Sequence, residues 1–212
     1  MSLQVALFAA AFGGAASAFI PRTAHRMAIP ATSYRRAPRP MWTVTAGALA
    51  AGLLGAALGP APLLVVLLPA VVLGVLLAAI DLRCLRLPDP LVALFAAVTV
   101  LPLSVGALAT GEPGRLVRAL LAAALTGAIY LIVAMLPGDG LGLGDVKLAA
   151  VLAFTLGDAG WSAVAIGLLA PHLINGPVAL SLLLTRRAER RTPLPLGPAL
   201  LAGALVAVIA TG

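Results

Sequence analysis

Long apolar runs dominate this chain, and short polar stretches separate them. A helix needs roughly 17–25 mostly apolar residues to cross a bilayer. The pattern predicts about eight transmembrane segments, at residues 2–20, 41–59, 63–80, 90–109, 117–136, 146–157, 161–184 and 196–211. Because lipid requires backbone groups to pair within each segment, we expect an all-α fold, a polytopic membrane helical bundle.

The composition supports a membrane protein and excludes several other classes. Hydrophobic residues make up 62% of the 212 residues, whereas soluble chains are about 45–50% apolar. We therefore attribute the net charge of +7 to basic loops that orient the protein in a lipid bilayer. No nucleic-acid partner is expected. The single cysteine rules out a disulfide within the chain and a multi-cysteine zinc site. We expect no metal and no cofactor.

Basic residues mark one side of the predicted bundle. Cytoplasmic loops of membrane proteins are enriched in Lys and Arg. With eight spans, alternate loops contain 12 of the 14 basic residues, and only Arg115 and Arg118 fall on the other side. The N- and C-termini are then both outside. The first run is taken as a span and not as a signal peptide, because its arginines follow the apolar stretch. The 12 residues are Arg22, Arg26, Arg35, Arg36, Arg39, Arg83, Arg86, Lys147, Arg186, Arg187, Arg190 and Arg191.

Two aspartates lie at the predicted cytoplasmic ends of apolar runs. Asp145 stands beside Lys147, the only lysine, and Asp81 ends another run. Two carboxylates around one water can divide proton transfer, one acting as base and the other as acid. Asp145 is predicted at a helix N-terminus, where the dipole favours an anion, and Asp81 just after a helix C-terminus. We therefore expect Asp145 to be the base and Asp81 the acid.

The sixth apolar run is short and follows several glycines. Its 12 residues, 146–157, make only about 18 Å of helix, against a hydrocarbon core about 30 Å thick. Asp145 would then lie about 10 Å below the cytoplasmic surface. The glycines predict irregular backbone, which is tolerated at such depth only beside protein or a water-filled cavity. A wet pocket is expected around Gly138, Gly140, Gly142 and Gly144.

Other polar residues have simpler expected roles. Asp89 follows a proline and is predicted to cap the next helix. Lys147 could hold a substrate carboxylate, tune Asp145 or be an interfacial charge. His172 and Asn175 lie beside prolines within a span, and we expect them to satisfy broken-helix backbone and not to bind metal. Cys84 has no neighbouring base in the sequence and is treated as a bystander.

Small residues indicate where the helices approach each other closely. The segment 46–52 and the region of Gly203 are rich in glycine and alanine, which lets membrane helices pack backbone against backbone. No internal repeat and no separate soluble domain is apparent.

Three segments resemble motifs of the type IV prepilin peptidases. Residues 81–89, Asp-Leu-Arg-Cys-Leu-Arg-Leu-Pro-Asp, are similar to the first aspartate motif of that family. Residues 142–148, Gly-Leu-Gly-Asp-Val-Lys-Leu, resemble its second motif, Gly-x-Gly-Asp. Residues 195–201 resemble the Pro-Phe-Gly-Pro run that opens its last helix, with Leu196 in place of phenylalanine. The resemblance covers roughly residues 42–211.

The resemblance implies an integral membrane aspartic endopeptidase with Asp81 and Asp145 as its catalytic pair. Gly142, Gly144 and Lys147 would support the pair or bind substrate. The implied substrate is a prepilin or pseudopilin, from which the enzyme cleaves the basic leader peptide. The implied location is the bacterial inner (plasma) membrane, with the active site facing the cytoplasm. The oligomeric state stays open.

The resemblance also implies a division of the chain. Residues 1–40 would form a first transmembrane helix and a basic cytoplasmic loop, and residues 41–212 the peptidase membrane domain. Many members of the family carry paired Cys-x-x-Cys motifs in a cytoplasmic domain between the first two spans. Here that loop, residues 21–40, contains no cysteine, which implies a shortened form without methyltransferase activity.

Two other functions fit an apolar chain with buried carboxylates. In a proton-coupled membrane transporter the two aspartates would carry protons. In a noncatalytic assembly protein of a pilus or secretion apparatus they would make structural pairs. A transporter favours paired repeats with interrupted helices, which this sequence lacks.

Overall fold

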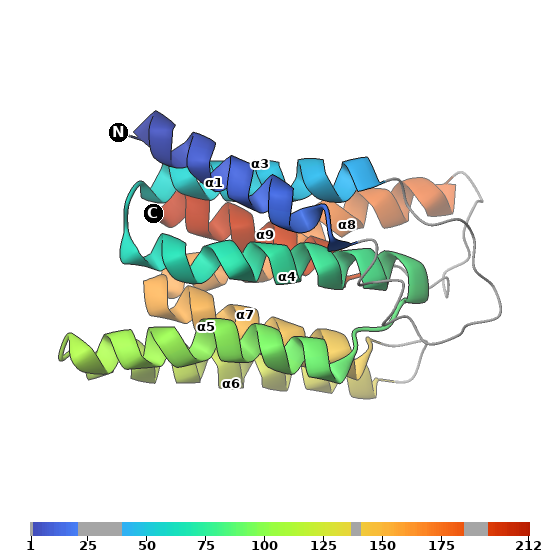
Figure 1. Cartoon of the computed structure of the whole chain (residues 1–212). Helices are drawn as coiled ribbons and strands as arrows, with labels where there is room; N and C mark the ends of the chain where they lie inside the picture. Colours follow the sequence, from blue (N-terminus) through green and yellow to red (C-terminus); the bar gives the residue numbers. More distant parts are fainter. Residues whose placement is uncertain (1, 21–39, 137–140, 185–194) are drawn as a thin grey trace.

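Eight α-helices build the part of the chain that the structure, a computed structural model, describes: residues 2–20, 40–136, 141–184 and 195–212 (Figure 1). Each helix coincides with one predicted apolar run, so the all-α prediction is confirmed. The helices are α1 (Ser2–Ser17), α3 (Pro40–Leu58), α4 (Pro62–Cys84), α5 (Asp89–Ala109), α6 (Pro113–Met135), α7 (Leu143–Ala159), α8 (Trp161–Leu184) and α9 (Gly197–Thr211).

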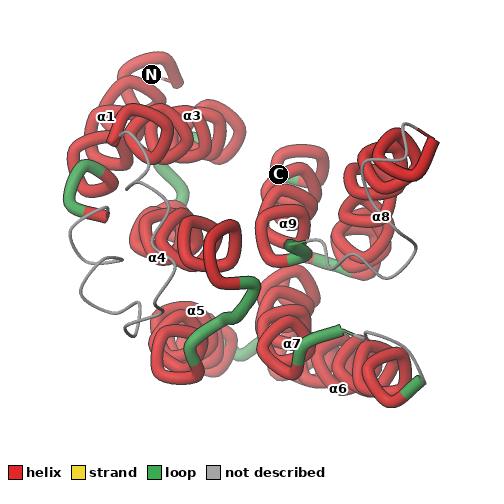
Figure 2. Tube along the Cα trace, turned by 90° about the vertical axis from the view of Figure 1, so that its right-hand side faces the viewer, coloured by secondary structure: helices red, strands yellow, loops and turns green. Residues whose placement is uncertain are grey.

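The helices run up and down along one common direction, and both chain termini lie at the same end of the bundle (Figure 1). Seen end-on, α1, α3, α4 and α5 form one side of the bundle and α6, α7, α8 and α9 the other (Figure 2). We call the end opposite the termini the aspartate end. There α4 ends three residues after Asp81, and α5, α7 and α9 begin at or near Asp89, Asp145 and Gly197. The arginine-rich segments 21–39 and 185–194 lie outside the described residues.

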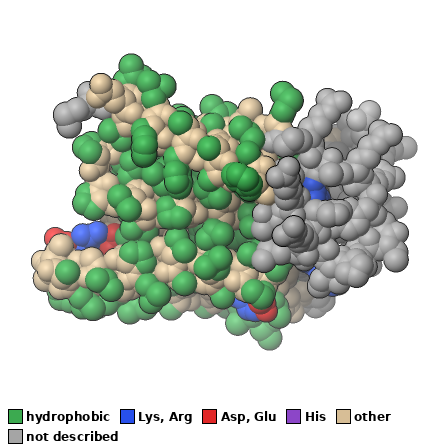
Figure 3. Space-filling model, viewed as in Figure 1, with side chains coloured by type: hydrophobic (Ala, Val, Ile, Leu, Met, Phe, Trp, Pro, Cys, Tyr) green, Lys and Arg blue, Asp and Glu red, His purple; other side chains and the backbone are tan. Residues whose placement is uncertain are grey.

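The lateral surface is apolar. Figure 3 shows hydrophobic side chains spread over the visible face, whereas the visible charged groups lie near its two ends. Exposed side chains include Leu101, Val105 and Leu108 on α5, each more than 60% accessible, as expected for a surface that faces lipid. Within the described residues, four helices, α3 to α6, are long and apolar enough to cross a membrane. The number of spans and the side on which the termini lie stay predictions.

Small residues set the closest helix approaches, as predicted. Gly47 of α3 faces Gly13 and Ser17 of α1 so closely that no side chain would fit between them. Gly203 of α9 packs on Pro171 of α8, where an added Cβ would lie 2.6 Å from the proline Cδ and 3.1 Å from its nitrogen. Both contacts involve backbone or a rigid ring, so neither neighbour can move aside easily.

Gly203→Ala should lower the thermal unfolding midpoint, because the new methyl group collides with the ring and backbone of Pro171. Overpacking of this kind costs about 1–3 kcal/mol of stability. Gly106→Ala is the matched control, since Gly106 also lies within a helix but has open space where its Cβ would be. That control should be neutral or slightly stabilising. Equal midpoints for the two variants in one detergent would contradict the packing argument.

Helix α7 begins earlier than predicted. It has 17 residues, about 26 Å at 1.5 Å per residue, and not the 12 of the apolar run. Gly142 is its extended N-cap, and the amides of Asp145 and Val146 donate to the Gly142 carbonyl at 3.0 and 3.2 Å. The prediction of irregular backbone at Gly144 is therefore wrong, since Gly144 lies in the first helical turn. Gly138 and Gly140 lie outside the described residues.

The far end of α7 is clamped to α6. Arg118 donates to the backbone carbonyls of Gly157 (2.6 Å) and Asp158 (2.8 Å), which end α7. Arg115 pairs with the buried Asp158 carboxylate at 2.6 Å and with Glu112 at 2.8 Å. Positive charges at a helix C-terminus interact favourably with the negative end of the helix dipole. The clamp fixes α7 lengthwise, and with it the position of its other end.

Candidate active site

Asp81 lies in the last turn of α4 and is only 3% exposed. The expectation that it follows the helix is therefore wrong, because α4 continues to Cys84, and its C-cap is Leu85, a residue in the left-handed conformation with φ 51°. The Asp81 Oδ2 atom accepts a hydrogen bond of 3.0 Å from the Gly197 amide. Gly197 opens α9, so Asp81 also faces the positive end of that helix dipole.

Asp145 lies in the first turn of α7, as predicted. The Gly142 amide donates a hydrogen bond to its carboxylate, which satisfies one of the free amides at the start of the helix. The other oxygen, Oδ1, is buried and has no hydrogen-bond partner among the described residues. Asp145 is therefore held by one oxygen, while the second is available for another group.

The two aspartates converge at the aspartate end. Asp81 and Asp145 are close enough for the charge of one to act on the other. The loop between α4 and α5 holds them in place, since Leu87 packs on Gly144 so tightly that a Cβ there would lie 2.8 Å from the Leu87 Cβ. Residues 64 apart in the sequence therefore form one electrostatic unit.

Lys147 and Asp89 form a second link between the same elements. The Lys147 Nζ lies 2.7 Å from the Asp89 Oδ1, which joins the fifth residue of α7 to the first residue of α5. The prediction that Asp89 caps α5 is wrong, because Pro88 is the N-cap and no side chain caps that helix. The pair links the two sequence motifs, residues 81–89 and residues 142–148, that contain the two aspartates.

A charge exchange tests the Lys147–Asp89 pair. Both side chains are more than half exposed, so the pair should contribute at most about 1 kcal/mol. Lys147→Asp and Asp89→Lys should each lower the thermal midpoint by a few degrees, because each places like charges together. The double variant should recover most of the loss, and high salt should reduce all differences. No recovery in the double variant would contradict a direct interaction.

Gly197 is the part of the site that sequence reasoning missed. It lies 116 residues from Asp81 in the chain, yet its amide is the hydrogen-bond donor to Asp81. An added Cβ at Gly197 would lie 2.9 Å from the Asp81 Oδ2, so a side chain would displace the carboxylate. The signal was the Pro-Leu-Gly-Pro run at 195–198, which marks a helix start but does not reveal its partner.

The other polar residues predicted inside a span bind backbone. The His172 ring nitrogen Nδ1 lies 2.9 Å from the Leu168 carbonyl one turn earlier. Asn175 donates to the Pro195 carbonyl at 3.5 Å, just before α9 begins. Both contacts agree with the expected role in satisfying backbone groups. Among the described residues, no three His, Cys, Asp or Glu side chains are placed to hold a metal ion together.

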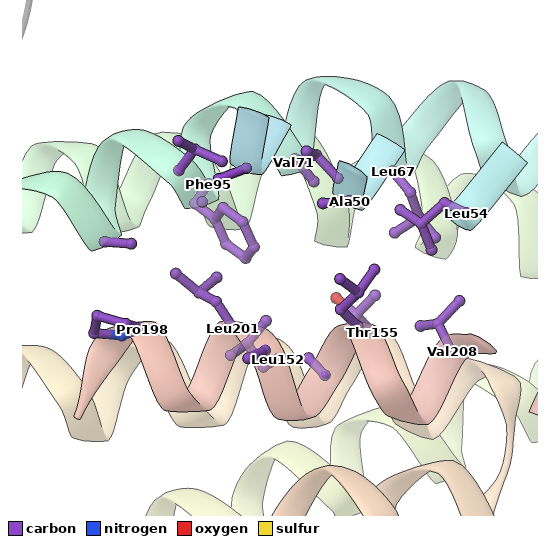
Figure 4. Close-up of a pocket in the computed structure, with 18 of the residues that line it drawn as sticks. Ala50, Leu54, Leu67, Val71, Phe95, Leu152, Thr155, Pro198, Leu201 and Val208 are labelled. Carbon is purple, nitrogen blue, oxygen red and sulfur yellow. The ribbon is translucent and has the colours of Figure 1, made fainter. Parts of the chain in front are cut away.

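An apolar cavity of about 310 Å³ runs along the bundle from the aspartate end. In Figure 4, Phe95, Val71 and Leu67 line one wall and Leu201 and Val208 the opposite wall. The cavity lining also includes Ala78, Leu82 and Pro198, which lie close in the chain to Asp81 and Gly197. The sequence predicted a wet pocket around the glycines, whereas this cavity is almost entirely apolar and belongs mainly to α3, α4 and α9.

Residues 71–210, which include both aspartates, Gly197 and most of the cavity wall, match the model of the type IV leader peptidase family. The chain belongs to that family. The resemblance seen in the sequence is thus confirmed, and with it a peptidase that acts on protein and is associated with a membrane. The leader peptidase match covers two thirds of the chain and begins within α4. No curated protein and no solved structure matches the chain significantly.

Proposed function

We propose that this leader peptidase is an integral membrane aspartic endopeptidase that cleaves the basic leader from type IV prepilin or pseudopilin-like substrates at the cytoplasmic face. Asp81 and Asp145 are the proposed catalytic pair. Gly142, Gly144 and Lys147 support it by fixing the first turn of α7. The observation that carries the proposal is the electrostatic contact between two carboxylates from different helices at one end of an apolar bundle.

The two carboxylates divide the proposed reaction. One, ionised, removes a proton from a water that attacks the scissile carbonyl carbon. The other, protonated, gives its proton to the carbonyl oxygen. As the tetrahedral intermediate collapses, the first carboxyl gives the proton that it took from water to the leaving amine, and the second recovers its own proton as the carbonyl re-forms. Both groups face a helix N-terminus, so the dipoles do not distinguish them. Asp81 has the smaller exposed surface of the two, and on that ground alone Asp81 is proposed as the acid and Asp145 as the base.

The apolar cavity suits the membrane part of the substrate. It extends along α9 from Pro198 to Val208, about 15 Å of helix, which is room for a few apolar side chains of a docked segment. A substrate whose apolar helix follows a basic leader would then place the junction beside the carboxylates. Arg83 and Arg86 lie near the same end, so attraction by charge does not account for binding of a basic leader.

A reconstituted cleavage assay tests the proposed function. The purified chain in liposomes is mixed with a peptide that has a basic leader followed by a transmembrane apolar helix. We expect one cut at the leader junction, identified by mass spectrometry, and no cut in a control peptide whose leader follows the helix. An intact peptide with every prepilin sequence tried, together with flux driven by a pH gradient, would overturn the proposal and favour a transporter.

A further inference from the structure

Tyr130 is a buried polar residue that the proposed reaction does not yet use. It lies on α6 and is 4% exposed, and its hydroxyl has no hydrogen-bond partner among the described residues. A buried hydroxyl without a partner loses its hydrogen bonds with water and is costly. Asp145 Oδ1 is a second buried oxygen without a partner, and the Tyr130 hydroxyl is within range of the Asp145 charge.

The geometry brings these two groups to one place. Tyr130, Ala149 and Leu200 line a cavity of about 20 Å³ where α6, α7, α8 and α9 meet, which is room for one water. Ala149 lies four residues after Asp145, on the same face of α7 and one turn deeper. Leu200 lies three residues after Gly197, the donor to Asp81. The cavity thus begins one helical turn beneath both carboxylates and continues to Leu156 and Ala204, deeper in the bundle.

We propose that Tyr130 is a positioning residue for Asp145, donating a hydrogen bond to its carboxylate either directly, after a small side-chain rotation, or through one water in this cavity. The inference rests on the proposed function of Asp145 as the base. A phenol is a donor that suits this place, because it gives a hydrogen bond without adding charge beside two carboxylates. It would fix the direction of the Asp145 oxygens toward the attacking water.

Several ionisable groups lie on the helices around Asp145. Asp81 faces it from α4 and Tyr130 from α6. His172 of α8 packs edge-on against the Tyr130 ring, with centroids 6.2 Å apart. Lys147 is on the same helix but is paired with Asp89 of α5. From α9 the Gly197 amide donates to Asp81 and not to Asp145. Of these groups, Tyr130 alone combines burial with an unused donor, while the Arg83 nitrogens, also buried without a partner among the described residues, lie on α4 two residues after Asp81.

Tyr130→Phe tests the inference by kinetics, since it removes the hydroxyl and keeps the ring against His172. Loss of a hydrogen bond to a charged group should lower kcat by about 10–100-fold, with little change in KM. The acidic limb of the pH–rate profile should move to higher pH, because the hydroxyl favours the ionised carboxylate. Thr126→Val is the matched control, as Thr126 is buried one turn earlier on α6 and lines the same cavity. It should leave kcat and the profile unchanged.

A spectroscopic measurement tests the same contact without substrate. The chain has two tyrosines, Tyr34 and Tyr130, so Tyr34→Phe grown with 3-fluorotyrosine carries one fluorine label. Its ¹⁹F resonance should move over the pH range in which carboxyl groups titrate and phenols do not. That movement should disappear in Asp145→Asn and persist in His172→Gln, which removes the imidazole that packs against the Tyr130 ring.

The two experiments separate failure of the inference from failure of the proposed function. If the wild type cleaves and Tyr130→Phe matches it in kcat and pH profile, Tyr130 does not position Asp145. A ¹⁹F resonance that does not follow Asp145 overturns the inference even if no substrate is cleaved. A resonance that follows Asp145 in a chain without cleavage supports the contact and refutes the endopeptidase.

Discussion

Asp81→Asn and Asp145→Asn should each reduce leader cleavage by about 10²–10⁴-fold, the usual contribution of a general acid or base. Asparagine has nearly the same shape as aspartate, so the Gly197 and Gly142 amides keep an acceptor oxygen. What disappears is the ability to take up or release a proton. The measurement is the initial rate of cleavage in liposomes, normalised to folded protein by size-exclusion chromatography.

The effects of the two substitutions on the cleavage rate should not be additive. Groups that act as one unit lose most of the activity when either is removed, so the double variant should be no slower than the worse single variant. Glu112→Gln is the control, because Glu112 is an exposed carboxylate beside Arg115 at the opposite end of the bundle. Full activity in either aspartate variant, or equal loss in Glu112→Gln, would refute the catalytic pair.

Gly144→Ala should lower the cleavage rate by about 10²-fold, because it separates the two catalytic elements. The new Cβ would lie 2.8 Å from the Leu87 Cβ and 3.2 Å from the Leu87 carbonyl oxygen. The loop after α4 must then move away from α7, and a displacement of about 1 Å at reacting groups can cost that factor. The measurement is kcat with the same substrate, with folding checked as above.

The direction of the change in unfolding stability distinguishes a clash at Gly144 from the ordinary effect of alanine in a helix. In an open helical position, alanine is more stable than glycine by about 0.5–1 kcal/mol. Gly114→Ala is the matched control, since Gly114 is also the second residue of its helix and meets nothing within 4 Å. The control should keep wild-type activity and melt at the same or a higher temperature. A fully active Gly144→Ala would contradict the view that the Leu87 contact sets the distance between the aspartates.

The helices were predictable from sequence because membrane helices are local. Each apolar run satisfies its own backbone groups, so the eight runs became the eight helices of the described residues. The start of α7 was missed by three residues, since Leu143 and Gly144 carry no apolar periodicity of their own. There the Gly142 cap and Asp145 extend the helix, which is a local polar effect that hydropathy does not register.

The two aspartates were also predictable, because charges at the ends of apolar runs are costly and few. Their surroundings were not. Gly197 binds Asp81 across 116 residues, and Lys147 binds Asp89 across 58. Such distances in sequence leave no periodic trace. The sequence does not distinguish Tyr130 from the apolar positions around it in α6, because only the structure shows where its hydroxyl group lies.

From sequence alone come the membrane class, the eight helical segments, the family and the two acidic residues. Each depends on composition or on residues within a few positions of each other. The tertiary structure decided which backbone amide holds Asp81, which loop spaces Asp145 from it, and where an apolar cavity reaches the site. Those outcomes depend on how small residues let helices pack side by side, and close packing between distant segments is a property of the whole bundle.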